Sequence, residues 1–445
     1  MNHPTPPSPD ERAFNDLLSD CVHCGFCLPT CPTYALWGEE VDSPRGRIHL
    51  MGQIEQGDVL NEAAVQAFDN CLGCLACVSS CPSGVAYDAL IETTRARVEE
   101  EHTRKAAERL LRALIFALFP HRKRLDLLRG PMRAYQSSGL QQLVRRSGLL
   151  ERLSPSVATM ERIAPPLPSR VPALPERVPA RGRRRAVVGM LTGCVQGSFF
   201  PQVNTATARV LASEGCDVVV PRDQGCCGAL SAHAGRPREA ADFARATVET
   251  FERAGVDAVV VNSAGCGATM KHYGRVLRQE GDDTWARRAE ALGAATVDFS
   301  EYLADLGPRA ERHPLPVTAA YHDACHLAHG QGVADQPRQL LRSVPELEVA
   351  ELPNPEICCG SAGVYNLLQP DTAAQLGDRK SEDARATGAG LLVAGNPGCS
   401  LQIASAVKRA GGSISVAHTT QVLDASIRGL ASSALVPGTP TTTAD

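Results

Sequence analysis

Short apolar runs alternate with amphipathic stretches between about residue 185 and residue 430. The runs are rich in Val, Ala and Leu, and the stretches between them repeat apolar residues at helical intervals of three and four. Such alternation is typical of parallel sheets whose strands are joined by crossover helices. The predicted strands are 186–190, 217–221, 257–262, 317–322, 347–353 and 390–395, and the predicted helices are 205–215, 238–255, 336–344 and 371–388.

The N-terminal part of the chain has a mostly helical pattern. Residues 45–70 carry apolar positions at helical spacing, and residues 104–130, rich in Arg and Leu, form an amphipathic pattern that Pro120 interrupts. We expect the apolar face of this second segment to pack on the chain itself, with a partner subunit or a membrane surface as alternatives. The proline-rich residues 164–180 predict an extended linker.

The cysteines show that the α/β part is an internal repeat. Cys194 is followed 32 positions later by the pair Cys226-Cys227, and Cys266 comes 40 positions after Cys226. The same pattern recurs in Cys325, Cys358, Cys359 and Cys399, at spacings of 33 and 41. Each set falls just past predicted strands, where open α/β sheets bind ligands.

Composition narrows the function. The chain has 445 residues, a net charge of -4 and 17 cysteines. A net negative charge gives no positive potential that would attract nucleic acid. We find neither an export signal nor an apolar run long enough to span a membrane. We therefore expect a cytoplasmic protein, at most peripheral on the inner face of the cell membrane. Cytosolic cysteines stay reduced, which favours metal ligation over disulfides.

Two motifs near the N-terminus read C-x2-C-x2-C-x3-C-P, the spacing of two 4Fe–4S clusters in which the fourth cysteine ligates the other cluster. Zinc would leave the third and fourth cysteines of each motif unexplained. Gly25 and Gly73 suit loops that approach the inorganic core closely, and we expect His23 to be a neighbour, not a ligand. The predicted ligands are Cys21, Cys24, Cys27 and Cys81 for one cluster and Cys31, Cys71, Cys74 and Cys77 for the other.

These observations predict a multidomain α+β protein: a mostly helical ferredoxin-like domain with two 4Fe–4S clusters, then two repeated α/β cysteine-rich (CCG) halves with parallel strands. The expected boundaries are 1–100 for the ferredoxin-like domain, 101–184 for the helical segment and linker, 185–312 and 313–430 for the two halves, and 431–445 for a flexible tail.

The repeated cysteines leave several chemistries open. Each half could hold a further iron–sulfur cluster, a zinc ion or a redox-active thiol set, or its cysteines could simply pack. Cys216 has no counterpart in the second half, so we expect an ordinary core cysteine. The candidate further ligands or proton carriers beside Cys325 are His322, Asp323, His326 and His329. No nucleotide-binding or nucleophile motif is present, so we assign no catalytic residue to this chain.

The chain resembles the iron–sulfur subunit of bacterial glycolate oxidase over nearly its whole length. The segments that carry the resemblance are CVHCGFCLPTCPTYALWGEEVDSPRGRIHL, CLGCLACVSSCPSGVAYDAL, NTATARVLASEG, GCCGAL, NSAGCGATMKHYG, ICCGSAGVYNLLQPDTAAQL and NPGC. The resemblance implies an oxidoreductase complex in which FAD-binding subunits oxidise glycolate to glyoxylate, and this chain relays electrons to an acceptor such as quinone. FAD is expected in the partner subunits only.

The two halves are also similar to the cysteine-rich domains of heterodisulfide reductase, but the final cysteine of that pattern is replaced by Thr269 and Gln402. Three alternatives follow: an equivalent subunit of a lactate or glycerol 3-phosphate dehydrogenase complex, a heterodisulfide-reductase-like enzyme, or a scaffold without redox function.

Overall fold

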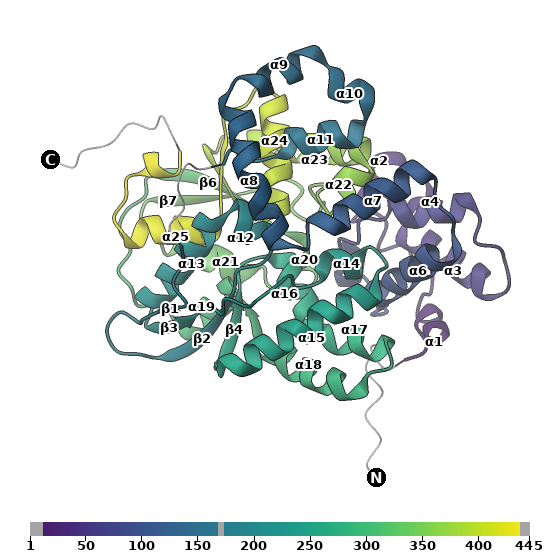
Figure 1. Cartoon of the computed structure of the whole chain (residues 1–445), viewed down its shortest axis with the longest axis horizontal. Coiled ribbons are helices and arrows are strands. Elements are labelled where there is room, and N and C mark those ends of the chain that lie inside the picture. The colour runs from purple at the N-terminus through teal and green to yellow at the C-terminus, as the bar shows by residue number, and fades with distance from the viewer. Residues whose placement is uncertain (1–11, 168–172, 437–445) are drawn as a thin grey trace, which may run out of the picture.

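The computed structural model describes residues 12–167 and 173–436, with a helical N-terminal region followed by two α/β halves (Figure 1). This arrangement confirms the predicted fold class. Residues 168–172 of the predicted linker and 437–445 of the predicted tail lie outside the described residues.

The first unit is built from short helices around the two cysteine motifs. The predicted helical stretch 45–70 is two helices, because the chain turns at Gly57 (φ +109°). Ser43 and Asn61 cap their N-termini through side-chain oxygens that accept from the Gly46 and Ala64 N–H groups, each at 3.0 Å. The elements are α1 Phe14–Ser19, α2 Pro32–Trp37, η2 Glu40–Asp42, α3 Pro44–Glu55, α4 Glu62–Asn70, α5 Ala76–Ser79 and α6 Tyr87–Glu101.

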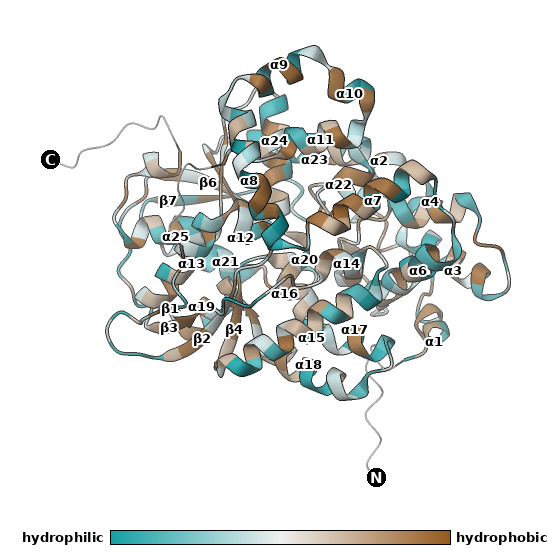
Figure 2. Ribbon diagram, viewed as in Figure 1, coloured by the Kyte–Doolittle hydropathy of each residue, from teal (hydrophilic) through white to brown (hydrophobic). Residues whose placement is uncertain are grey.

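The Arg- and Leu-rich segment forms five helices, and Pro120 separates the first two as predicted. The segment only partly packs on the chain: α7 buries Ile115 and Phe116, α8 buries Leu125, and α9 and α10 bury no residue. Figure 2 shows apolar residues in brown along α9 and α10. The helices are α7 Ala106–Leu118, α8 Arg122–Ser137, α9 Leu140–Ser147, α10 Leu149–Leu153 and α11 Pro155–Ile163.

The two halves contain sheets of the same strand order. The first is β1-β3-β2-β4-β5 and the second is β7-β6-β8-β9. Apart from the added edge strand β1, the two orders correspond, with β2 between β3 and β4 in the first sheet and β6 between β7 and β8 in the second. All pairings are parallel except that of β1, which runs antiparallel to β3. The predicted linker therefore ends in a sheet edge. The strands are β1 Arg177–Val178, β2 Ala186–Leu191, β3 Cys216–Val219, β4 Ala258–Val261, β5 Thr296–Asp298, β6 Val317–His322, β7 Leu347–Glu351, β8 Leu391–Ala394 and β9 Ser415–Ala417.

Helices cover both sheets. The first half contains α12 Val195–Phe199, α13 Pro201–Ser213, α14 Ala229–His233, α15 Pro237–Ala254, α16 Ala264–Lys271, α17 Tyr273–Gln279, α18 Asp283–Ala295 and α19 Phe299–Leu306. The second half contains α20 Cys325–Ala328, α21 Asp335–Arg342, α22 Tyr365–Leu368, α23 Pro370–Ala386, α24 Pro397–Arg409, α25 Thr419–Ile427 and η3 Ser432–Ala434.

One hydrophobic core joins the halves. Val188 and Val260 of the first sheet and Tyr321 and Val393 of the second belong to the same buried cluster. At this junction α13 packs on α25, and α19 packs on α21. The burial of apolar area between the sheets holds the halves in a fixed relation.

His418 adds a polar contact across the same junction. Its Nε2–H donates to the Asn262 carbonyl of the first half at 2.9 Å, and its Nδ1 accepts from the Thr420 N–H at 3.1 Å. Burial lowers the pKa of His418 to about 4, so the ring is neutral at pH 7.

Replacing His418 with glutamine should flatten the loss of stability at low pH. Between pH 6.5 and pH 4 the unfolded chain binds a proton at this residue and the folded chain does not, so the free energy of unfolding falls as the pH falls. Over that window the wild-type imidazole accounts for a loss of about 3 kcal/mol. Urea unfolding at several pH values measures this. The exposed His49 provides the control His49→Gln, and a His418→Gln protein with the wild-type pH dependence would contradict the prediction.

None of the helices in the described parts of the chain is both long enough and apolar enough to cross a lipid bilayer.

Candidate iron–sulfur sites

All 17 cysteines lie in the described residues, and each is a free thiol. All of them except Cys216 lie at three places: an outer site near the surface, an inner site beneath it, and the surroundings of a cavity between the two CCG halves.

The outer site holds the four cysteines predicted for the first cluster. Cys21, Cys24, Cys27 and Cys81 line one small cavity, which Cys77 also reaches. Cys24 is exposed, and the other three are half-buried. Gly25 has φ +88°, as the predicted loop requires, and the exposed His23 offers its carbonyl to the Arg45 guanidinium at 3.0 Å.

The inner site holds the four cysteines predicted for the second cluster. Cys31, Cys71, Cys74 and Cys77 line a second cavity, and all four are buried. The fourth cysteine of each motif thus lies with the first three of the other motif, as crossed ligation requires. The ligand assignment itself stays a prediction.

Two arginines set the electrostatics of the inner site. Burial alone would raise the pKa of Cys71, but the nearby guanidinium groups of Arg47 and Arg95 outweigh it and lower that pKa. The Gly73 N–H donates to the Cys71 sulfur at 3.3 Å, and the Tyr87 hydroxyl lies 3.6 Å from it. These groups favour the thiolate, the form that binds iron.

The repeated cysteines form a matched chain of thiols in each half. In the first half the Cys194 and Cys226 sulfurs lie 3.6 Å apart, Cys226 contacts Cys227, and Cys227 contacts Cys266. In the second half the contacts run in the same order, as Cys325–Cys358, Cys358–Cys359 and Cys359–Cys399. The halves therefore offer equivalent sets of soft donors, suited to iron or zinc.

A cavity of about 190 Å³ lies between the two sets. It is lined by cysteines of both halves together with Cys71 and Leu72 of the inner site, namely Cys194, Cys226, Cys227, Cys266, Cys325, Cys358 and Cys399. Cys74 shares a buried apolar cluster with Cys358. The inner site and the second half are thus direct neighbours.

Polar contacts fix the ferredoxin-like domain on both halves. The Arg275 guanidinium and His233 hold the pKa of Glu92 well below its usual range despite its burial, with Arg275 at 2.9 Å and His233 at 2.8 Å. Two of the histidines beside Cys325 contact the same domain. The His326 Nε2–H donates to the Gly73 carbonyl at 2.8 Å, and His329 Nδ1 lies 2.7 Å from the Ser79 hydroxyl.

The remaining candidates near Cys325 differ from these two. Asp323 forms an ion pair with Arg338 at 2.6 Å, so it is structural in this geometry. His322 is buried beside Cys359 and Cys399, and burial followed by the charge of Lys380 lowers the pKa of His322 to about 3. Cys216 lies in the core that joins the halves, as predicted.

Sequence reasoning missed Arg47, Arg95 and Tyr87 around Cys71. Arg47 sits in an amphipathic helix where its charge predicts exposure, yet its side chain is 1% exposed. The one sequence signal for a role near the clusters is its position between the two cysteine motifs, three residues after Pro44.

Family models match four segments of the chain. Residues 17–85 match a 4Fe-4S dicluster domain, residues 107–164 match the linker region of the glycolate oxidase iron-sulfur subunit, and residues 188–271 and 319–404 each match the cysteine-rich domain. The chain is therefore an iron–sulfur protein with two cysteine-rich repeats.

Two curated relatives match over more than nine-tenths of the chain, and a third matches about half of it. The chain is 37% identical to a probable glycolate oxidase iron-sulfur subunit of Bacillus subtilis, over 93% of this chain and 95% of the relative. It is 32% identical to the glycolate oxidase iron-sulfur subunit of Escherichia coli, over 92% and 94%. The lactate utilization protein A of Halalkalibacterium halodurans is 33% identical, over 53% of this chain and 96% of the relative. With its two motifs, its linker and both CCG repeats matched, this chain belongs to the family of glycolate oxidase iron–sulfur subunits.

Proposed function

We propose that this chain relays electrons, released when an FAD-binding partner subunit oxidises glycolate to glyoxylate, to an acceptor such as quinone. The observation that carries the proposal is the unbroken series of cysteine sites from the exposed Cys24, through the buried inner site, to the cavity between the halves. Bound 4Fe–4S clusters supply one-electron redox chemistry.

The residues proposed to hold the two clusters are those of the outer and inner sites. The outer ligands are Cys21, Cys24, Cys27 and Cys81, and the inner ligands are Cys31, Cys71, Cys74 and Cys77. Both sets fit the group, because each set brings four thiols to one cavity. The eight cysteines of the CCG halves are proposed to hold further iron, as the matched thiol contacts support.

The protein environment of the inner site favours electron uptake. Arg47, Arg95 and the Gly73 N–H place positive charge or a donor near Cys71. Such groups stabilise the more negative, reduced state of a cluster and raise its potential.

We further propose that the domain boundaries are those expected from the sequence.

We also propose that the chain works in the cytoplasm, on the inner face of the membrane. Exposed leucines of α9 and α10, among them Leu143 and Leu153, lie beside arginines such as Arg146. An apolar face flanked by basic residues suits a peripheral contact with anionic lipid.

Lactate is the second candidate substrate for the partner. It is favoured by the similarity of about half of this chain to lactate utilization protein A. Disulfide reduction is less well supported, since the Gln402 amide is held by Asn366 and Ala373 and offers no free group in place of the missing cysteine.

Anaerobic purification of the chain with its co-purifying partners, followed by substrate-dependent reduction of an artificial acceptor, tests the proposal. Glycolate should drive reduction, with flavin present in the preparation, and the chain freed of partners should show none. Lactate and glycerol 3-phosphate are the comparators. Activity with a comparator and not with glycolate would keep the relay and overturn the substrate.

A further inference from the structure

His322 is a buried imidazole without a hydrogen-bond partner among the described residues. It is 1% exposed, and neither Nδ1 nor Nε2 meets a donor or an acceptor. The buried His418 and His326 instead use their ring nitrogens in hydrogen bonds. An unpaired buried polar group costs about 1–3 kcal/mol, so such a group calls for an explanation.

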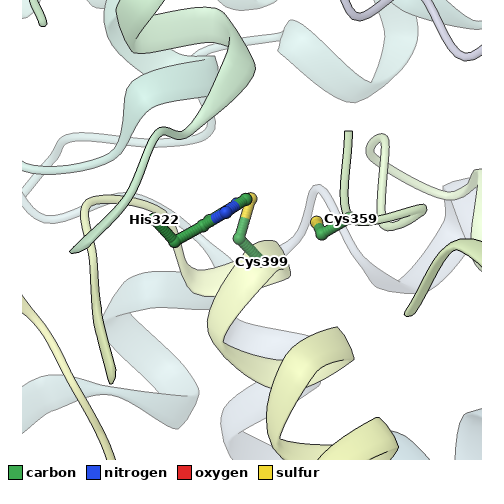
Figure 3. A group of neighbouring side chains, drawn as sticks. All are labelled: His322, Cys359 and Cys399. Carbon is green, nitrogen blue, oxygen red and sulfur yellow. The ribbon is translucent and has the colours of Figure 1, made fainter. Parts of the chain in front are cut away.

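Its nearest candidate partners are thiols. One ring nitrogen of His322 and the sulfurs of Cys359 and Cys399 all lie within 4.8 Å of one another. Figure 3 shows the His322 ring extending toward the Cys399 sulfur. Imidazole nitrogen and thiolate sulfur are both ligands for transition metals such as iron.

The first half lacks this imidazole. His322 is the last residue of β6, three positions before Cys325, and Leu191 is the last residue of β2, three positions before Cys194. Leu191 is 1% exposed and packs in an apolar cluster with Cys227. The two thiol chains are alike, but among the described residues a ring nitrogen lies with two of their sulfurs only in the second half, at Cys359 and Cys399.

The side chain at position 402, where a further cysteine would stand, cannot take this role in its observed orientation. The Gln402 carbonyl oxygen accepts from Asn366 Nδ2 at 3.2 Å, and its amide nitrogen donates to the Ala373 carbonyl at 2.7 Å. His322 reaches the same end of the thiol chain from the neighbouring strand, with its nitrogens unused.

We propose that His322 is a nitrogen ligand, together with Cys359 and Cys399, of an iron centre in the second CCG half. This rests on the proposed function only in assuming that the half holds redox-active iron. A neutral imidazole in place of an anionic thiolate raises the potential of an iron–sulfur centre, as in clusters with mixed Cys and His ligands. Because Cys74 and Cys358 share a buried cluster, the inner site would face this centre directly.

The test uses the full chain, purified anaerobically with its partners and labelled with ¹⁵N-histidine. Pulsed EPR of samples poised at a series of potentials should show a ¹⁵N coupling of the strength expected for a directly bound imidazole. Metal analysis should show more iron than two 4Fe–4S clusters contain. His322→Leu, which installs the residue of the first half, should abolish the coupling, and the buried control His418→Gln should keep it.

Absence of the coupling from wild-type protein, or its persistence in His322→Leu, would overturn the assignment. The wild-type measurement decides even if His322→Leu fails to fold. Glycolate-dependent activity without any imidazole coupling would reject the ligand and leave the proposed function standing. The coupling without glycolate-dependent activity would do the reverse.

Discussion

Cys74→Ser is expected to abolish glycolate-dependent electron transfer through the complex while leaving partner binding intact. Cys74 is a predicted ligand of the inner site, is 8% exposed, and shares a buried cluster with Cys358. Changes to outer groups around metal ligands cost about 10–100-fold in affinity or activity, so loss of a ligand should cost more than about 100-fold in rate. The measurement is anaerobic reduction of a quinone analogue, with co-purification reporting partner binding.

Cys216→Ser is the matched control for this variant. Cys216 is equally a buried thiol, but it lies in the core between the sheets, where the Tyr302 hydroxyl lies 3.8 Å from its sulfur. We expect this variant to keep electron transfer. A Cys74→Ser complex that reduces the quinone analogue at the wild-type rate would contradict a relay through the inner site.

Arg47→Met should strongly destabilise the ferredoxin-like domain, because Arg47 is a buried charge with several buried partners. Arg47 donates to the Ala67 carbonyl at 2.6 Å and to the Thr33 hydroxyl at 3.2 Å, and it forms an ion pair with Asp42 at 3.1 Å. Removing one partner of a buried ion pair leaves an uncompensated charge and costs about 3–5 kcal/mol. Anaerobic urea unfolding, followed through the visible absorbance of the clusters, measures the shift.

Two further variants isolate the cause. Arg97 forms ion pairs with Glu55 and Glu101 at the surface, so Arg97→Met should leave the unfolding midpoint nearly unchanged. Adding Asp42→Leu to Arg47→Met removes the buried carboxylate that has lost its partner, and should recover part of the lost free energy of unfolding. An Arg47→Met protein as stable as Arg97→Met would show that the buried pair does not hold this domain together.

The strands and helices that position the cysteines could be predicted because their apolar patterns are long. The runs ending at Leu191 and His322 are buried strands, and the helix from Pro370 to Ala386 carries a clear helical period. The strands Thr296–Asp298 and Ser415–Ala417 were missed, because three residues are too few to show a period. The edge strand Arg177–Val178 was missed because it lies in a proline-rich stretch.

The candidate sites also have features that the sequence predicts and features that depend on tertiary packing. The spacing of the N-terminal cysteines predicts crossed ligation, since the contacts are largely set by short loops. That Cys74 would meet Cys358, or that both CCG sets would line one cavity, depends on how distant elements pack, which spacing does not encode. The burial of Arg47 and the unpaired ring of His322 likewise appear only once the surrounding elements are placed.

The packing between the halves gives the chain an internal pseudo-symmetry. α13 and α21 follow the first strand of their halves, and α19 and α25 follow the last, so the contacts α13–α25 and α19–α21 are the same contact made twice. Such reciprocity defines the isologous interface of a symmetric dimer. The two halves are therefore arranged as the subunits of a pseudo-symmetric dimer, connected by residues 307–316. A protease cut in that connection would leave the two pieces associated.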